Sequence, residues 1–202
     1  MDRIGRVAQL LGLIGPFVVT HATRRSGLLR GDHVELTAVR DADRERLFEW
    51  INDREQVLYN AGYAPVHESD HVAWFESIRT RSGVVLFAIR TLTGEELIGS
   101  CQLRDIDHRH STAELQIRIG APEHRGKGYG TDAVRLLLTH AFRDLGLARV
   151  QLHVFATNPR AIRAYEKAGL RQEGVLRSAA YIDGRRCDVV VMGILRGEAD
   201  VD

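Results

Sequence analysis

Three glycines and two basic side chains fill the connection Glu123-His-Arg-Gly-Lys-Gly-Tyr-Gly-Thr-Asp-Ala133. Closely spaced glycines leave main-chain amides uncovered, and the positive end of a following helix dipole favours an anion there. Arg125 and Lys127 add positive charge beside these amides. The segment therefore predicts a phosphate-binding loop of the kind that holds a pyrophosphate.

The spacing of the glycines separates this loop from better-known nucleotide sites. A P-loop needs Ser or Thr directly after its lysine, whereas Gly128 follows Lys127. A dinucleotide-binding turn needs Gly-x-Gly-x-x-Gly in an N-terminal βαβ unit, but here Gly126, Gly128 and Gly130 alternate more than halfway along the chain. A tight strand-to-helix connection that merely needs glycine is the remaining alternative.

A second segment, residues 157–170, places a tyrosine on a short helix. Asn158 followed by Pro159 is a strong helix start, and Gly169 supplies the turn that ends it. Apolar spacing puts Tyr165 on the buried side, about 10 Å along the helix from Asn158. A phenol can donate a hydrogen bond or a proton to a developing anion. A space-filling core aromatic is the alternative interpretation.

The elements around these two segments follow from the periodicity of apolar residues. The loop lies between a strand over 113–119 and a helix over 134–145, and a strand over 150–155 leads to the tyrosine helix. The remaining elements are strands over 33–39, 84–90 and 97–104, helices over 41–51 and 69–81, and a hairpin of 176–182 with 186–195 around Asp183-Gly184. This order predicts an α+β (α/β) fold, a mixed and mainly antiparallel sheet of about seven strands with helices on both faces.

Taken together, the two segments resemble a known family. Arg125-x-x-Gly128-x-Gly130 followed by Asn158-x-x-Ala161-x-x-x-Tyr165-Glu-Lys-x-Gly169 is similar to the GNAT superfamily of acyl-CoA-dependent N-acetyltransferases. The similarity is closest to the ribosomal-protein-alanine, polyamine and amino-sugar branch, and it covers about residues 28–195. It implies the GNAT fold, in which the sheet splays between the fourth and fifth strands to admit the cofactor.

The resemblance also implies a role for each matching residue. The CoA pyrophosphate would be held by Arg125, Gly126, Lys127, Gly128, Tyr129, Gly130 and Thr131. The pantetheine arm would pair as an added strand with Gln116, Ile117, Arg118 and Ile119. Asn158 would contact the pantetheine, and Tyr165 would protonate the departing thiolate.

An acceptor amine must lose a proton before it attacks a thioester, so a general base is expected. Glu114, at the start of the strand before the loop, is the first candidate. His153 on the following strand and Glu123 at the loop mouth are the others. Glu114 and His153 have structural alternatives, because Glu114 could be solvated on the opposite face and His153 could be a hydrogen-bonded strand residue.

The function implied by the resemblance is transfer of an acetyl group from acetyl-CoA to a primary amine, by direct attack in a ternary complex. The acceptor that the resemblance implies is an amino sugar, another small amine or a protein N-terminus. Trp50, Tyr59, Tyr63 and Trp74 place aromatic surface on the expected acceptor side, although helical phase also fits Trp50 and Trp74 in the core. A non-catalytic acyl-CoA-binding regulatory module is the alternative function.

Composition sets limits on partners. The 202 residues include 28 basic and 27 acidic side chains, a balance that gives no indication of a nucleic-acid partner. Cys101 and Cys187 lack paired or zinc-like spacing and indicate buried thiols in a reducing, cytoplasmic compartment. The Asp105–His110 cluster fits a polar hairpin loop better than a metal site, so no metal is expected.

The predicted domain covers residues 28–197, with a tail over 198–202 and an N-terminal extension over 1–27. The apolar run of this extension, broken by Gly15-Pro16, is too short for a membrane helix, so no stable membrane insertion is expected. It has the general shape of a signal peptide but lacks an Ala-x-Ala cleavage site. It could pack on the domain or on a second subunit, which leaves a homodimer open.

Overall fold

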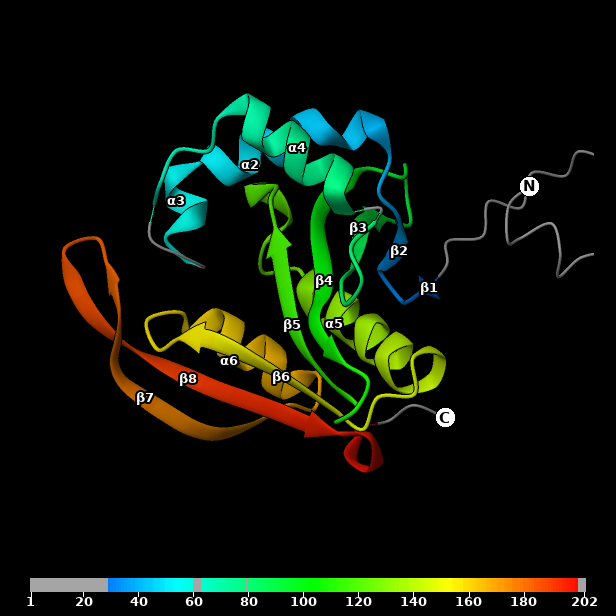
Figure 1. Cartoon of the computed structure of the whole chain (residues 1–202), viewed down its shortest axis with the longest axis vertical. Coiled ribbons are helices and arrows are strands. Elements are labelled where there is room, and N and C mark those ends of the chain that lie inside the picture. Colours follow the sequence, from blue (N-terminus) through cyan, green and yellow to red (C-terminus); the bar gives the residue numbers. More distant parts are fainter. Residues whose placement is uncertain (1–28, 60–62, 79, 200–202) are drawn as a thin grey trace, which may run out of the picture.

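The computed structural model describes residues 29–59, 63–78 and 80–199, which form one eight-stranded sheet with its helices (Figure 1). The strand order is β1-β2-β3-β4-β5-β6-β8-β7, and each neighbouring pair is antiparallel except β5 with β6. The strands are β1 (Leu29–Arg30), β2 (Val34–Ala38), β3 (Val85–Thr91), β4 (Leu97–Asp107), β5 (Thr112–Ile119), β6 (Arg149–Phe155), β7 (Arg171–Ile182) and β8 (Arg185–Leu195).

The helices cover opposite faces of this sheet. They are α2 (Arg44–Asn52), α3 (Arg54–Val57), α4 (Glu68–Ile78), α5 (Tyr129–Thr139) and α6 (Pro159–Lys167). Adjacent residues of a strand point to opposite faces. Arg118 of β5 donates a hydrogen bond to the carbonyl of Trp50 in α2, while its neighbour Ile119 lies against the start of α5 at Gly130. Thus α2 lies on one face of β5 and α5 on the other.

The feature of the sheet that matters most for function is the short contact between β5 and β6. Their parallel pairing covers only Thr112 with Arg149, Ala113 with Val150 and Glu114 with Gln151. Beyond Glu114 the two strands diverge, as Figure 1 shows, and β6 continues in partnership with β8 alone. The edge of β5 from Leu115 to Ile119 is therefore open toward β6.

The predicted fold is confirmed, with the two-residue β1 added to the seven expected strands. Helix α5 begins at Tyr129 rather than 134, because its first turn is Gly-rich and polar and carries no apolar periodicity. It continues as a π-helical turn, His140–Asp144. The short α3 was not predicted; the side chain of Asp53 caps it by accepting from the amide of Gln56. The Asp183-Gly184 hairpin turn is confirmed, with both residues at positive φ.

Helix α5 is fixed to the sheet by its apolar face and by one buried carboxylate. Val134, Leu137 and Leu138 are buried on the sheet side. Asp132, in the first turn, accepts hydrogen bonds from the main-chain amides of His33 at 2.8 Å and Val34 at 3.0 Å. These bonds attach the helix N-terminus to the start of β2 and so position the glycine loop.

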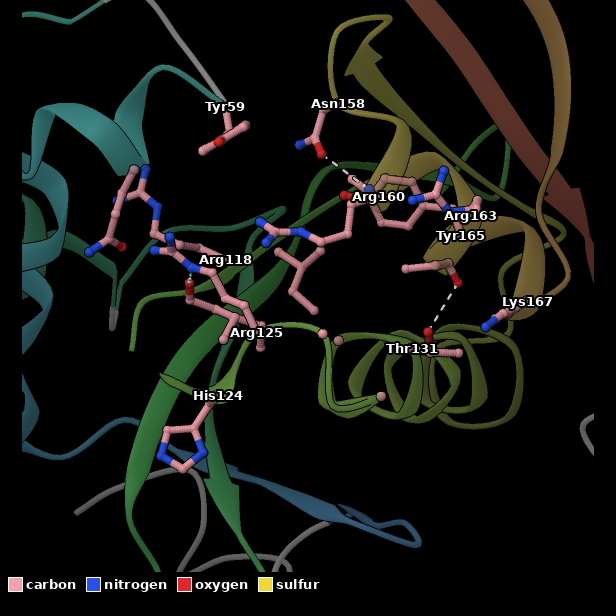
Figure 2. Close-up of a pocket in the computed structure, with 18 residues that line it drawn as sticks. Tyr59, Arg118, His124, Arg125, Thr131, Asn158, Arg160, Arg163, Tyr165 and Lys167 are labelled. Carbon is pink, nitrogen blue, oxygen red and sulfur yellow. Dashed lines mark hydrogen bonds between the residues drawn. The ribbon is translucent and has the colours of Figure 1, made fainter. Parts of the chain in front are cut away.

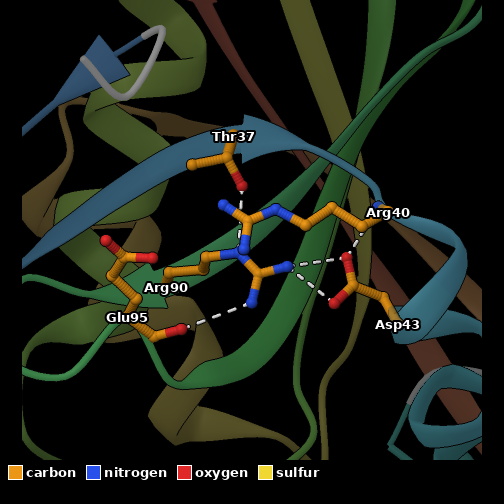
Figure 3. Close-up of polar contacts among 5 residues, drawn as sticks. All are labelled: Thr37, Arg40, Asp43, Arg90 and Glu95. Atoms are coloured by element: carbon orange, nitrogen blue, oxygen red, sulfur yellow. Dashed lines mark hydrogen bonds and ion pairs between the residues drawn. The ribbon is translucent and has the colours of Figure 1, made fainter. Parts of the chain in front are cut away.

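A buried ion pair attaches the first helices to the sheet (Figure 3). Nη2 of Arg90 in β3 lies 2.6 and 2.7 Å from the two carboxylate oxygens of Asp43, in the turn before α2. Both side chains are almost fully buried, at 5% and 6% exposed. Thr37 and the carbonyl of Glu95 accept the remaining hydrogen bonds of the guanidinium. The pair therefore fixes the position of the start of α2 relative to the sheet.

Both predicted terminal segments lie wholly or partly outside the described residues. The extension over 1–27 lies outside them, as do residues 200–202 of the tail. Arg196–Glu198 forms a short 3-10 turn, in which Glu198 pairs with Arg171. Within the described ranges, no helix has both the length and the apolar character that crossing a bilayer requires.

Candidate active site

The glycine loop has the backbone geometry that an anion site needs. Gly126 and Gly128 have φ of 76° and 89°, in the left-handed region that disfavours other residues. Gly128 is the N-cap of α5 and makes no side-chain cap bond. The first amides of α5 are therefore left for a ligand at the positive end of the helix dipole.

Arg125 connects this loop to the end of β5. Its Nε donates to the carbonyl of Ile119 at 3.2 Å, and its Nη2 donates to the carbonyl of Gly120 at 3.3 Å. Burial and the nearby Arg125 lower the pKa of Arg118, while Asp53 opposes the shift. Because guanidinium groups titrate far above neutrality, Arg118 remains charged beside the cavity despite this shift.

A cavity of about 470 Å³ lies between the loop, the open edge of β5 and α6 (Figure 2). Its charged side chains are all basic, and no carboxylate belongs to the described residues that line it. The basic lining consists of Arg118, His124, Arg125, Arg160, Arg163 and Lys167. We call this space the basic cavity, and its charge suits a polyanionic ligand.

A second cavity, of about 590 Å³, opens between β4, β5, β6 and the helices α2 and α4. Its lining is mainly apolar and aromatic, with Trp74, Leu86 and Phe155 among the residues. We call it the second cavity. Five residues line both spaces, namely Tyr59, Ile117, Arg118, Asn158 and Tyr165. The two cavities therefore meet where β5 and β6 diverge.

Tyr165 lies at this junction. Burial raises the pKa of its phenol to about 12, so the side chain keeps its proton throughout the neutral range. No hydrogen bond to its hydroxyl is present among the described residues. The hydroxyl is thus available as a donor. Asn158 caps α6 by accepting from the amide of Ala161 at 3.1 Å, which fixes the start of the helix that carries Tyr165.

Most of the predicted cofactor-binding side chains line one cavity or the other. Gln116 lines the second cavity and Ile119 the basic cavity, while Ile117 and Arg118 line both. Thr131 lines the basic cavity, and its hydroxyl donates to the carbonyl of Ala164, which joins α5 to α6. The predicted cofactor-binding residues that line the basic cavity are Ile117, Arg118, Ile119, Arg125, Gly126, Gly128, Gly130, Thr131, Asn158 and Tyr165.

The side chains of Lys127 and Tyr129 do not line the cavities in the described structure, which leaves their predicted contact with the pyrophosphate to main-chain amides. The ring of Tyr129 packs against His33 and His124 instead. Its position at the start of α5 leaves only its main chain to face an anion.

Glu114, the first-ranked base, does not line the cavities in the described structure. It is only 14% exposed, and Nη2 of Arg104 donates to its Oε1 at 2.5 Å. Its Oε2 lies 3.4 Å from Nδ1 of His153, which does line the second cavity. Glu123 is exposed outside both cavities. Glu114 and His153, which are separate candidates for the general base in the sequence, thus contact each other in the structure.

The aromatic side chains divide between core and cavity. Trp50 is buried at 4% exposed, where it packs over Gly120, so the core interpretation is confirmed for it. Trp74 and Tyr59 line the second cavity, whereas Tyr63 is exposed outside it. Cys101 also lines this cavity, but burial raises the pKa of its thiol and disfavours a nucleophilic thiolate.

Several lining residues were not found from the sequence. Arg160, Arg163 and Lys167 share the cavity face of α6 with Tyr165. Their i, i+3 and i+7 spacing was a usable signal. Gln56 and His71 line the cavities through α3 and α4. Their positions depend on the connection between helices, which has no clear sequence pattern.

The polar loop predicted over Asp105–His110 is shorter than expected, because β4 extends to Asp107 and the turn follows it. Asp107 stabilises this turn by accepting from the amides of Arg109 and His110. Elsewhere in the described ranges, Glu96, Glu123 and His124 bring possible ligand atoms within 4.8 Å of one another. Nε2 of His124 already lies 3.2 Å from Oε2 of Glu96. We assign no metal to this group.

Comparison with known proteins identifies the family of this fold and site. The family model of the acetyltransferase (GNAT) domain matches residues 33–171. The chain belongs to the GNAT family. The match contains the glycine loop, the diverging strands and Tyr165, so the sequence-based resemblance is confirmed.

Relatives within the GNAT family include named amine acetyltransferases. A spermidine N(1)-acetyltransferase of Vibrio cholerae is 40% identical over 104 residues, which are 52% of this chain and 60% of that protein. An uncharacterised N-acetyltransferase of Bacillus subtilis is 26% identical, over 84% of this chain and 97% of the relative. The chain thus matches about three fifths of the length of the spermidine enzyme in that alignment.

A solved structure extends this similarity over the whole fold. The spermidine N-acetyltransferase from Vibrio cholerae, in complex with CoA and spermine, superposes with a TM-score of 0.77 at 30% identity. The superposition covers 82% of this chain and 96% of that one. The GNAT fold of this chain is thereby confirmed.

Gly128→Val is expected to weaken acetyl-CoA binding by more than about tenfold, with a smaller effect on kcat. A β-branched residue at a φ of 89° costs about 1–3 kcal/mol, and relieving this strain moves the amides that face the basic cavity. Isothermal titration with acetyl-CoA measures the effect.

Gly94→Val is the matched control for this substitution. Gly94 has a φ of 92° in the turn between β3 and β4, with open space around it. It therefore shares the backbone strain without facing a cavity. Equal loss of acetyl-CoA affinity in both variants would show that general destabilisation, rather than the loop, causes the effect.

Proposed function

We propose that this GNAT protein is an acetyl-CoA-dependent N-acetyltransferase that moves an acetyl group to a primary amine. The observation that carries the proposal is the place of Tyr165, a protonated and unpaired phenol at the junction of two cavities of different chemistry. One cavity suits a polyanionic donor, and the other suits a less charged acceptor. Reactants in the two cavities would meet beside this hydroxyl.

Acetyl-CoA is the proposed occupant of the basic cavity. Its pyrophosphate would accept hydrogen bonds from the amides between Gly126 and Thr131, with Arg125 as the adjacent cation. Its pantetheine amides would pair with the open edge of β5 from Gln116 to Ile119, as an added strand. The V. cholerae relative was solved with CoA, which supports this choice of donor.

Direct attack of the amine on the thioester is the proposed route. The buried thiol of Cys101 disfavours an acetyl-cysteine intermediate, because its raised pKa keeps it protonated. Attack breaks the bond between carbon and sulfur, and the departing thiolate would take the proton of Tyr165. A phenol held at high pKa remains a donor until the thiolate forms.

The acceptor proposed here is a compact amine with a single positive charge, such as an amino sugar, another small monoamine or a peptide N-terminus. Among the described residues that line the second cavity, Asp70 is the one carboxylate, and the guanidinium of Arg118 opposes its charge. An extended polyamine needs several acidic partners along its length. Although the V. cholerae relatives are named for spermidine, this lining favours a smaller total charge.

A panel of amines tests the proposal through release of the CoA thiol. Glucosamine, a small aliphatic monoamine, an Ala-initiated peptide and spermidine are each incubated with protein and acetyl-CoA. Thiol release is expected with a monoamine and to be weaker with spermidine. Tight acetyl-CoA binding without thiol release for any amine would instead support the regulatory module.

A cytoplasmic location and a homodimer stay predictions.

A further inference from the structure

We propose that His153 is the group that takes the proton of the acceptor amine, and that Glu114 positions it. This inference rests on the proposed function. It starts from the contact between Nδ1 of His153 and Oε2 of Glu114, which are 3.4 Å apart. Glu114 therefore acts through the imidazole rather than on the amine directly.

Strand register places His153 where the chemistry would occur. Glu114 and Gln151 are the last paired residues of β5 and β6, and His153 lies two residues beyond Gln151. Because side chains repeat every two residues along a strand, His153 points to the same face as Gln151 and Glu114. This position is the first on that face after the strands separate. It lies in the lining of the second cavity, which also contains Tyr165.

The direction of the bound cofactor leads to the same position. The pyrophosphate loop follows the Ile119 end of β5, so a pantetheine arm along this strand runs toward Leu115. The four steps from Ile119 to Leu115 cover about 13 Å. The thioester would therefore lie near the point where β5 and β6 begin to diverge, where His153 faces the second cavity.

The two oxygens of the Glu114 carboxylate have different partners. Arg104 in β4 binds Oε1 through both Nε, at 3.2 Å, and Nη2, at 2.5 Å. This contact keeps the carboxylate in place and leaves Oε2 toward His153. A carboxylate at Nδ1 orients the imidazole with Nε2 as the proton-accepting atom and stabilises the imidazolium that forms.

The charges around His153 come from several elements. Glu114 of β5 and Arg104 of β4 lie on one side of the ring. The titratable groups that line the same cavity are Asp70 and His71 of α4, Arg118 of β5 and Tyr165 of α6. Burial and the charge of Arg44 lower the pKa of His71, which favours its neutral form. His153 is the imidazole in this lining that has a carboxylate partner in the described structure.

The proton balance of the reaction is complete with these groups. Nε2 of His153 takes one proton from the acceptor ammonium and later releases it to solvent. The free amine forms the new carbon–nitrogen bond, and the carbon–sulfur bond breaks. The thiolate then takes the proton of Tyr165, and the phenolate regains the proton that the acetylated nitrogen loses. The products are the N-acetyl amine, free CoA and one proton.

His153→Gln is expected to lower kcat/KM about 10²-fold at neutral pH, with acetyl-CoA affinity retained. It should also change the shape of the pH profile of kcat/KM, because glutamine lacks the titratable imidazole. In His153→Ala, added imidazole should restore part of the rate, which a purely structural role does not predict. The assay uses the best amine of the panel.

Two further variants complete the test. Glu114→Gln should lower kcat/KM less than His153→Gln, and the double variant should be no worse than His153→Gln alone. His108→Gln, in the exposed turn after β4, is the control and should match wild type. Circular dichroism and acetyl-CoA titration identify any variant that fails to fold.

The outcomes separate this proposal from the proposed function. Wild-type protein that releases no thiol with any amine would overturn both. Active wild type with His153→Gln within about twofold of it at every pH would overturn the role of His153 alone. A large loss in Glu114→Gln without a loss in His153→Gln would also contradict it, because Glu114 would then act without the imidazole.

Discussion

Tyr165→Phe is expected to lower kcat about 10²- to 10³-fold while acetyl-CoA affinity changes by less than about threefold. The substitution removes one hydroxyl from the junction of the two cavities and keeps the ring that packs against the hydrophobic core. That hydroxyl has no partner among the described residues, so its removal leaves none of them without a hydrogen bond. The loss should therefore fall on the chemical step, as measured by steady-state kinetics and acetyl-CoA titration.

The pH dependence of kcat, compared between the wild type and Tyr165→Phe, gives a second readout. Because burial raises the pKa of Tyr165 to about 12, the wild-type phenol keeps its proton up to high pH and should cause no loss of activity below about pH 10. Tyr181→Phe, at a tyrosine that is 62% exposed on the β7–β8 hairpin, is the control. Unchanged kcat in Tyr165→Phe at every pH would rule out the proton-donor role.

Arg90→Met is expected to lower the free energy of unfolding by about 3–5 kcal/mol, because it leaves the buried Asp43 carboxylate without its partner. This is the largest stability effect that we expect from a single substitution. Urea denaturation followed by circular dichroism measures it. The double variant Arg90→Met/Asp43→Leu should recover much of the loss, since it removes the unpaired charge.

Arg46→Gln is the control for this measurement. Arg46 and Glu49 form an ion pair on α2 with both side chains about half exposed, at 51% and 52%. Exposed pairs contribute about 0–1 kcal/mol, so the change should be small. If Arg90→Met and Arg46→Gln gave equal losses, the buried pair would have no special role in holding α2.

The buried pair also connects stability with the second cavity. Leu47 and Ile51 of α2 line that cavity, while Asp43 immediately precedes the helix. A shift of α2 would move these side chains relative to β5. Under conditions where Arg90→Met stays folded, it should therefore raise KM for the amine more than KM for acetyl-CoA.

Local signals were sufficient to predict the elements that we propose bind the donor. The glycine loop needs positive φ at Gly126 and Gly128, and glycine is the residue that adopts it at low cost. Asn158-Pro159 specifies the start of α6, so the position of Tyr165 along that helix followed from counting residues. These features depend on neighbours within about one helical turn, and such neighbours are visible in a sequence.

Other parts of the site required contacts between distant segments. The sequence identified Glu114 and His153 as separate candidates, but their contact depends on where β5 and β6 stop pairing. No local pattern specifies that point, because it depends on strand pairing between distant segments: β6 pairs with β8 along its whole length but with β5 at only three positions. The packing of the Tyr129 side chain is another example, since His33, which lies far away in the sequence, contacts its ring together with His124.

The sequence by itself determined the glycine loop, the tyrosine helix and the GNAT fold, because backbone constraints and periodicity act over short stretches of chain. Only the tertiary structure decided which faces meet. It joined the basic cavity to the second cavity at Tyr165 and placed His153 rather than Glu114 in the lining of the second cavity. It also left Asp70 as the one carboxylate among the described residues of that lining. These properties depend on side chains that lie far apart in the sequence and come together only when the sheet forms.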